Sequence, residues 1–227
     1  MVTLQETAVK FNNNLHASHT GGRLSSDSGL LLVDELMDAF HFEDLIKQLI
    51  TFKENRRYWT HTNQKILKQM VLQLIAGYKA DSSADILRHD PMLKTLSLED
   101  ALASQPSISR FFDRITEQTI DDFQVFNQAL IDQARLVRND TDMIIDLDST
   151  HSDTFGRQEQ TDYNAHYGTH GYHPIVAFDG LTGDFLKAKL RPGNQYTSTG
   201  VKAFLEPLLE HYNRAIPTTD ILVRGDS

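Results

Sequence analysis

A chain of 227 residues, 40% hydrophobic and 23% charged, has the composition of an ordinary globular protein and is long enough to bury a sizeable core. It has no cysteine, no apolar run of about 20 residues and no secretory signal; this excludes disulfides, cysteine-ligated zinc and membrane-spanning helices and predicts a cytoplasmic protein. Its net charge of −9 argues against a nucleic-acid partner, unless basic residues cluster on one surface or acidic residues surround bound metal ions.

Residues 1–140 are predicted to form an all-helical region behind an irregular arm. The first 26 residues are polar and contain Gly21-Gly22, so we expect at most one short strand there. Behind the arm, apolar residues recur at the spacing of helices with one buried face, and Asp90-Pro91 is interpreted as a helix break. This pattern predicts helices over residues 28–40, 45–50, 60–78, 81–87, 108–115 and 119–137, with a core stripe of Ile66, Leu67, Met70, Val71, Leu74 and Ile75.

Four arginines of this helical region are candidate DNA contacts. Arg56 and Arg57 precede a Tyr-Trp pair, and such a basic and aromatic connector suits contact with a nucleic-acid backbone and stacking on bases. Arg110 and Arg114 are spaced to share one exposed face of a short helix, as in a recognition helix. An ordinary solvated surface is the alternative for both segments, and the sequence leaves this choice open.

Residues 141–227 change to a strand pattern. The continuous apolar run at 143–145 is typical of a strand covered on both faces, and alternating residues around Asp179-Gly180 indicate a β-hairpin. The expected order is a strand at 143–145, hairpin strands at 173–178 and 185–190, a helix capped by Thr197 or Ser198, and a strand at 221–223. The last strand is expected to run parallel to the first, which gives a mixed sheet and an α+β fold class.

Acidic residues follow the first and last of these strands. If the two strands are parallel neighbours, Asp148 and Asp226 emerge at the same edge of the sheet. Two carboxylates held close together need a cation between them or a shared proton, and oxygen-only ligands favour Mg²⁺ or Mn²⁺. The alternative is that each aspartate simply caps a turn.

Several motifs, taken together and in order, resemble those of bacterial insertion-sequence transposases of the DDE type, specifically insertion sequence family 1380. In the helical region the matching segments are LRHDP at 87–91 and SQPSISR at 104–110. In the second region they are DST at 148–150, YNAHYG at 163–168, GYHP at 171–174, FDGLTGD at 178–184, RPGN at 191–194 and RGDS at 224–227. The resemblance covers nearly the whole chain.

The resemblance implies an RNase H-like catalytic fold over residues 141–227 and a region that binds transposon ends over residues 1–140. Asp148 and Asp226 match the first two acids of the family's Asp-Asp-Glu triad, with Asp146 as the rival for the first position. The implied cofactor is Mg²⁺ or Mn²⁺. The implied partner is double-stranded DNA, both transposon ends and target, bound by a homo-oligomer. Asp179 and Asp184 are interpreted as turn residues.

The family's third acid is a glutamate on a helix after the fourth strand, and no residue matches it. Glu206 and Glu210 lie on the predicted helix before that strand, which is the wrong place in this fold. We therefore expect the N-terminal portion of a longer transposase, inactive by itself and marginally folded after about residue 140. The predicted function is metal-dependent cleavage of transposon ends and strand transfer into target DNA; a metal-dependent nuclease and a non-catalytic DNA-binding remnant are the alternatives.

Overall fold

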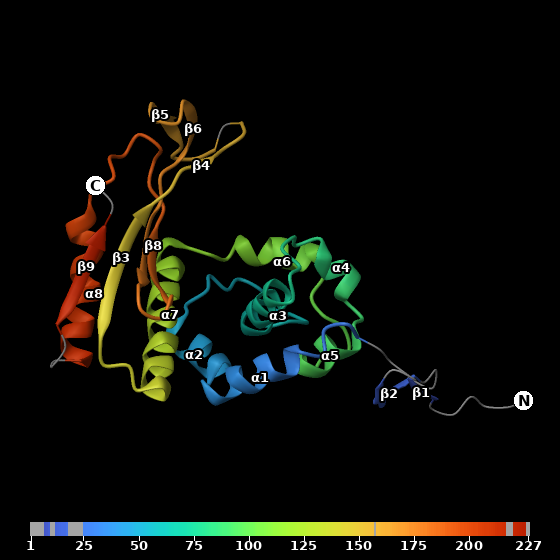
Figure 1. Ribbon diagram of the computed structural model, residues 1–227. Helices are drawn as coiled ribbons and strands as arrows, with labels where there is room; N and C mark the ends of the chain where they lie inside the picture. The colour runs from blue at the N-terminus through green and yellow to red at the C-terminus, as the bar shows by residue number, and fades with distance from the viewer. Residues whose placement is uncertain (1–6, 10–11, 18–24, 157, 217–219, 226–227) are drawn as a thin grey trace, which may run out of the picture. The chain divides into compact units, whose positions relative to one another are not determined.

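The computed structural model describes residues 7–9, 12–17, 25–156, 158–216 and 220–225 (Figure 1). The chain divides into two compact units, Met1–Asp122 and Phe123–Ser227. The boundary between these two units falls inside helix α7, Glu117–Arg138. No helix in the described parts of the chain is long and apolar enough to cross a membrane.

The first unit begins with a hairpin and continues with helices. Strands β1 (Thr7–Val9) and β2 (Asn12–Ala17) pair antiparallel, where we expected at most one short strand. The run of asparagines in β2 lacks the apolar alternation that marks a strand in a sequence. The helices that follow are α1 (Leu30–Ala39), α2 (Phe42–Leu49), α3 (Asn63–Ile75), α4 (Ser83–Leu87), α5 (Pro91–Ser97) and α6 (Gln105–Phe112).

Helix α3 follows the predicted core stripe in its first half, where Ile66 and Leu67 are buried, but not in its last turn. Leu72 is fully buried, but Leu74 and Ile75 are more than half exposed, so the last turn of the expected core stripe is wrong. Gln69 is buried instead, because its side-chain amide donates to the Ala103 carbonyl at 2.9 Å and accepts from the Ala103 amide at 2.8 Å. This paired bond makes a polar residue part of the packed face.

The second unit is built on a four-stranded sheet. Its strands are β3 (Met143–Ser149), β7 (Ile175–Asp179), β8 (Phe185–Lys189) and β9 (Ile221–Gly225), in the order β8-β7-β3-β9 (Figure 1). Strand β7 is antiparallel to both β3 and β8, whereas β9 is parallel to β3 and follows helix α8, Val201–Ala215. The predicted mixed sheet and α+β fold class are confirmed.

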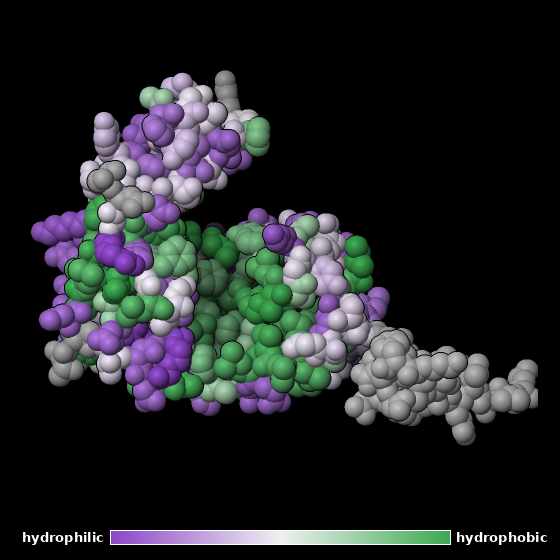
Figure 2. Space-filling view, viewed as in Figure 1, coloured by the Kyte–Doolittle hydropathy of each residue, from purple (hydrophilic) through white to green (hydrophobic). Residues whose placement is uncertain are grey.

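Helices α7 and α8 supply the apolar residues that cover one face of this sheet. The core cluster comprises Ile131, Met143, Ile145, Ile175, Ala177, Leu186, Phe204, Leu208 and Tyr212. On the opposite face Phe178 is 37% exposed and Leu222 is 54% exposed, and Figure 2 shows hydrophobic surface over the strands of this unit. The apolar run at 143–145, of a kind typical of strands covered on both faces, is therefore covered on one face by the described residues.

The chain between β3 and β7 in the sequence forms a separate three-stranded sheet, which the strand pattern did not predict. It consists of β4 (Ser152–Asp153), β5 (Asp162–Asn164) and β6 (Thr169–Tyr172), in the order β4-β6-β5. A Cβ atom on Gly171 would overlap the Ser152 carbonyl, and one on Gly193 would overlap the Asp162 carbonyl. Glycine at both positions therefore lets the backbones of this sheet and the following loop approach closely.

The start of α8 also differs from the expectation. Gly200, with φ of 74°, is the N-cap, rather than Thr197 or Ser198. The Val201 amide donates to the Ser198 carbonyl, so a turn precedes the helix and the left-handed backbone at position 200 needs glycine.

Candidate active site and nucleic-acid interface

The candidate active site lies at the end of β3, beside the parallel strand β9. In the register of this pair, Asp146 is opposite Arg224 and Leu147 is opposite Gly225. Asp148 is the next residue on β3 and is exposed. The other predicted acid, Asp226, follows Gly225 in the sequence and lies outside the described residues.

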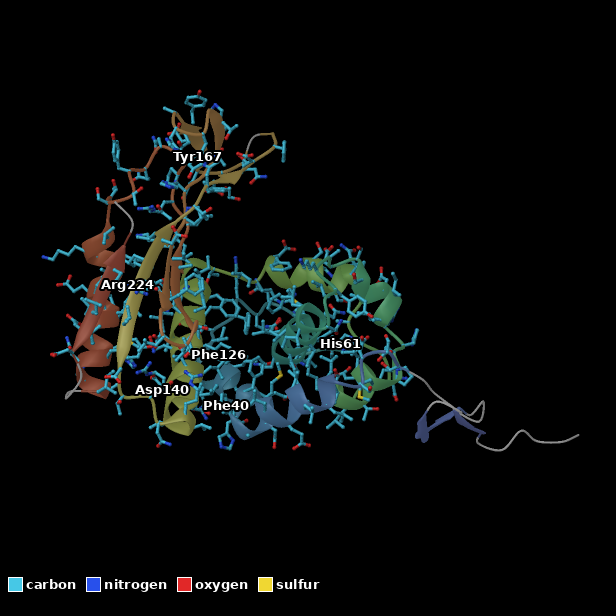
Figure 3. All side chains as sticks on the ribbon, viewed as in Figure 1. Phe40, His61, Phe126, Asp140, Tyr167 and Arg224 are labelled. Carbon is cyan, nitrogen blue, oxygen red and sulfur yellow. The ribbon has the colours of Figure 1, made fainter. Side chains whose placement is uncertain are left out.

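Asp146, the rival for the first catalytic position, is bound by Arg224. The Arg224 Nε donates to Asp146 Oδ1 and its Nη2 donates to Oδ2, both at 2.6 Å, in a bidentate ion pair across the strands. Figure 3 labels Arg224 on β9. Hydrogen bonding to Arg224 lowers the pKa of the Asp146 carboxyl, and the same bond raises the pKa of Arg224. Both oxygens of Asp146 are therefore engaged with a cation of the chain itself.

Gly180 in the β7–β8 turn leaves room for this ion pair. Its amide donates to the Ile144 carbonyl at 2.7 Å, which brings the turn over β3. A Cβ atom on Gly180 would overlap Asp146 Oδ2 and Arg224 Nη2. The turn motif thus has a role at the candidate site that its sequence did not indicate.

Asp148 lines a pocket of about 620 Å³ together with residues of the small sheet and of the loop at 193–197. The aromatic side chains in its wall include Tyr163, His166, Tyr167, His173 and Tyr196, and Figure 3 labels Tyr167. The carboxylate of Asp148 makes no hydrogen bond or ion pair with any described residue. A free carboxylate beside exposed aromatic rings suits metal binding next to stacked nucleic-acid bases.

The residues at this edge fit a hard divalent cation in their donor chemistry. Asp148 offers carboxylate oxygens, and the chain has no thiol that would favour a soft metal. Within the described ranges, no three histidine or acidic side chains are grouped so that they would hold a metal ion. A metal bound here would therefore need Asp226, beyond the described ranges, or ligands from DNA and water.

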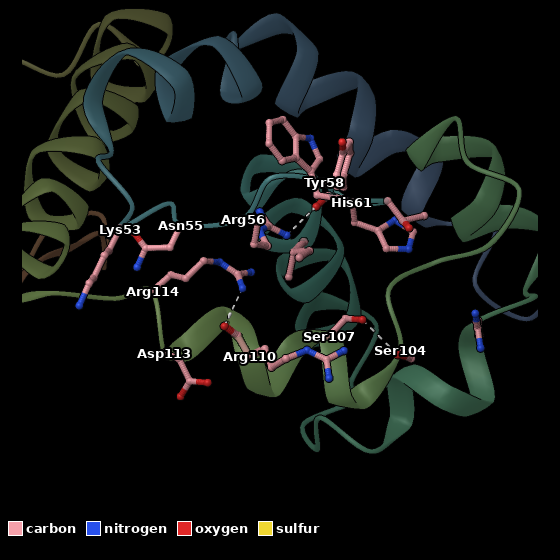
Figure 4. A pocket seen from close by; sticks show the side chains of 14 residues that line it. Lys53, Asn55, Arg56, Tyr58, His61, Ser104, Ser107, Arg110, Asp113 and Arg114 are labelled. Carbon is pink, nitrogen blue, oxygen red and sulfur yellow. Dashed lines mark hydrogen bonds between the residues drawn. The ribbon is translucent and has the colours of Figure 1, made fainter.

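A second pocket, of about 560 Å³, lies in the helical unit (Figure 4). Five cationic side chains line it: Lys53, Arg56, Arg88, Arg110 and Arg114. One lining residue, Asp113, is acidic, and Tyr58 and Trp59 add aromatic surface. A protein with a net charge of −9 thus concentrates positive charge on one surface, which removes the composition-based objection to a nucleic-acid partner.

The four predicted DNA-contact arginines occupy different positions around this pocket. Arg110 is exposed and lines it, whereas Arg57 is exposed and does not. Arg114 also lines it but is only 9% exposed, so the expectation of an exposed face shared with Arg110 is wrong. Helix α6 ends at Phe112, and the chain turns before it reaches Arg114.

Arg56 lines the pocket too, but its donors are used within the unit. Its Nε and Nη2 bind the two carboxylate oxygens of Glu54 at 2.8 and 2.6 Å, Nη1 donates to the His61 carbonyl, and Nη2 also reaches Asn63 Oδ1. Asn63 Oδ1 in turn accepts from Arg114 Nε at 2.8 Å. Arg56 therefore holds the wall of the pocket in place.

This network predicts a pH dependence of stability. The hydrogen bond from Arg56 lowers the pKa of Glu54 from 4.5 to about 2. Because the folded state holds the ionised carboxylate more favourably than the unfolded state does, ionisation of Glu54 stabilises the fold. This stabilisation is complete above about pH 4.5 and is lost as the pH falls towards 2. When the pH is lowered from 5 to 3, the free energy of unfolding measured in urea should fall less for Glu54→Gln than for the wild type. For Glu35→Gln, an exposed control on α1, it should fall as much as for the wild type.

Comparison with known proteins gives one family match and one distant structural similarity. A comparison with curated protein sequences finds no match. The cryo-EM structure of a piggyBac transposase synaptic complex with hairpin DNA is similar with a TM-score of 0.38 and 12% sequence identity, over 89% of this chain and 51% of that chain. The chain thus spans about half the length of that transposase. The model of the family described as transposase DDE domain group 1 matches residues 7–227, and the chain therefore belongs to this family.

Proposed function

We propose that this chain acts in DNA transposition as a member of insertion sequence family 1380, with Asp148 and Asp226 as metal-binding catalytic acids. The observation that carries the proposal is the parallel pairing of β3 with β9, in which Leu147 lies opposite Gly225. Asp148 and Asp226 follow these two residues in the sequence. The family match and the absence of a competing ion pair at Asp148 in the described residues support the assignment.

The proposed cofactor is Mg²⁺ or Mn²⁺, held by the carboxylates of Asp148 and Asp226. When bound, the ions would activate water or a DNA 3′-hydroxyl for attack on phosphorus and stabilise the leaving oxygen. Asp146 would remain paired with Arg224 and keep β3 and β9 in register. The aromatic side chains in the pocket beside Asp148 would stack on bases near the reacting phosphate.

Double-stranded DNA is the proposed partner, as both transposon ends and target. Residues 1–140 would bind the transposon ends, with Arg56, Arg57, Arg110 and Arg114 as the basic residues concerned, and residues 141–227 would carry the catalytic acids. Joining two transposon ends would bring at least two copies of the protein together on DNA.

Mn²⁺ titration tests the metal site in this chain directly. Because Mn²⁺ broadens the NMR signals of nearby nuclei, backbone amide signals of residues 147–149 and of the C-terminal residues should disappear first. Asp148→Asn should remove this selective broadening, whereas Glu206→Gln, on the exposed side of α8, should keep it. Equal broadening in wild type and Asp148→Asn would overturn the assignment of Asp148.

A strand-transfer assay separates a transposase from a nuclease of similar fold. The whole protein, with Mg²⁺, a labelled DNA end and a supercoiled target plasmid, should give covalently joined products that Asp148→Asn abolishes. Cleavage without joining would support the nuclease alternative instead.

A further inference from the structure

Arg114 has an unused hydrogen-bond donor inside the basic pocket of the helical unit. Its side chain is 9% exposed; Nε donates to Asn63 Oδ1 at 2.8 Å and Nη1 to the Arg110 carbonyl at 2.7 Å. Its Nη2 is buried and has no hydrogen-bond partner in the described part of the chain. Figure 4 shows this side chain pointing into the pocket, between Arg56 and Arg110. A buried charged donor left unpaired is costly, so its presence points to an external acceptor.

The surrounding charges favour an anion as that acceptor. Lys53, Arg88 and Arg110 line the same pocket and form no ion pair within the described ranges. Glu54 is engaged by Arg56, and Asp113 is the one carboxylate in the lining. Burial, and then repulsion by Arg56, lower the pKa of Arg114, as expected for a cation short of negative neighbours. A bound anion would relieve this excess of positive charge.

The shape and walls of the pocket indicate which anion it takes. A volume of about 560 Å³ exceeds that of a single simple ion and is within the usual range for ligand pockets. Trp59 is 53% exposed and Tyr58 is 91% exposed, and exposed rings beside cations are typical of surfaces that bind a nucleic-acid strand. The planar fork of a guanidinium matches the oxygens of a phosphate group.

We propose that this pocket binds a backbone phosphate of DNA. The Nη2 of Arg114 and the guanidinium of Arg110 donate to the phosphate oxygens, and Lys53 and Arg88 contact the neighbouring phosphates. Asn63, held by Arg56, orients Arg114 through the Nε bond. This inference rests on the proposed function in DNA transposition. It brings three of the four candidate DNA-contact arginines, Arg56, Arg110 and Arg114, to one site.

Binding of a labelled duplex to the full chain in EDTA, followed by fluorescence anisotropy at several salt concentrations, tests the proposal. Arg110→Gln and Arg114→Lys should each weaken binding roughly tenfold or more, since each loses a charge-assisted hydrogen bond. Arg110→Gln should also lower the slope of log K against log salt by about one, because one phosphate contact is lost. Arg114→Lys should leave the slope nearly unchanged, since the charge remains but the fork is lost.

Lys79→Gln is the matched control, since Lys79 is an exposed cation of the same unit that does not line the pocket. It should change affinity much less than Arg110→Gln. Arg110 has no side-chain partner among the described residues, so its replacement keeps the test valid even if Arg114→Lys alters folding. If Arg110→Gln changed neither the DNA affinity nor its salt dependence, the phosphate-pocket proposal would be overturned while the metal-site proposal stayed intact.

Duplexes with 5′-phosphate and 5′-hydroxyl ends distinguish the source of the phosphate. A backbone site binds both equally. A preference for the 5′-phosphate that disappears in Arg114→Lys would assign the pocket to a DNA terminus and overturn the backbone proposal. Failure of the wild type to bind any DNA would overturn both this inference and the proposed function.

Discussion

Asp179→Ala is expected to destabilise the sheet unit by about 3–5 kcal/mol, because it leaves a buried guanidinium without its counterion. Arg135 Nη1 donates to Asp179 Oδ2 at 2.7 Å, and the two side chains are only 6% and 1% exposed. Arg135 Nη2 also donates to the Asp142 carbonyl at 2.9 Å, and its guanidinium lies 5.6 Å from the centre of the Tyr212 ring. Urea unfolding followed by circular dichroism measures the effect.

Two further variants test whether the effect of Asp179→Ala comes from the lost ion pair or from a disturbed β7–β8 turn. Asp184→Ala removes an acid of the same hairpin whose ion pair with Arg138 lies at the surface, so it should cost at most about 1 kcal/mol. Arg135→Met combined with Asp179→Leu should recover most of the stability, since apolar residues can replace a buried pair. A cost for Asp179→Ala no larger than that for Asp184→Ala would contradict the assigned role.

Phe204→Ala is expected to lower the free energy of unfolding by about 3–5 kcal/mol, because α8 packs on the sheet through this residue. Phe204 is 3% exposed and belongs to the cluster that covers one sheet face. Such a loss approaches the whole stability of many domains, about 5–15 kcal/mol. Thermal and urea unfolding should both show it.

Phe185→Ala on the other sheet face is the control for this prediction. Phe185 is 40% exposed and contacts Phe178 edge to face, with ring centres 5.6 Å apart. Phe185→Ala should lower the free energy of unfolding by well under half as much as Phe204→Ala does. Equal costs for the two variants would mean that the second face is buried in solution.

The spacing of apolar residues predicted those helices and strands that bury one face and leave the other exposed. The order strand, hairpin, helix, strand followed from apolar runs and the Asp-Gly turn, and the parallel return of β9 followed from the helix that precedes it. The Asp90-Pro91 pair before helix α5 marks both the end of one helix and the start of the next. Asp90-Pro91 ends one helix, but Asp90 also accepts hydrogen bonds from the amides of Met92 and Leu93 and begins the next.

The features that the sequence did not predict depend on contacts between distant residues. Asp179 was interpreted as a turn residue, and its carboxylate does accept from the Leu181 amide, but its ion pair with Arg135 on α7 requires the folded sheet. The small sheet beside Asp148 depends on close backbone approach at Gly171. In the basic pocket, Asn63 joins Arg56 of the connector to Arg114 in the turn after α6, a contact that no local pattern encodes.

A double-mutant cycle of Asp148→Asn and Asp226→Asn on Mn²⁺ affinity tests the central proposal most directly. If both carboxylates bind one ion, each single variant should remove most of the affinity and the double variant should be little worse. The coupling free energy should then be about 0.5–3 kcal/mol, the range for residues in one interacting site. Strictly additive effects, or an Asp226→Asn variant that binds Mn²⁺ as tightly as the wild type, would contradict a shared metal site.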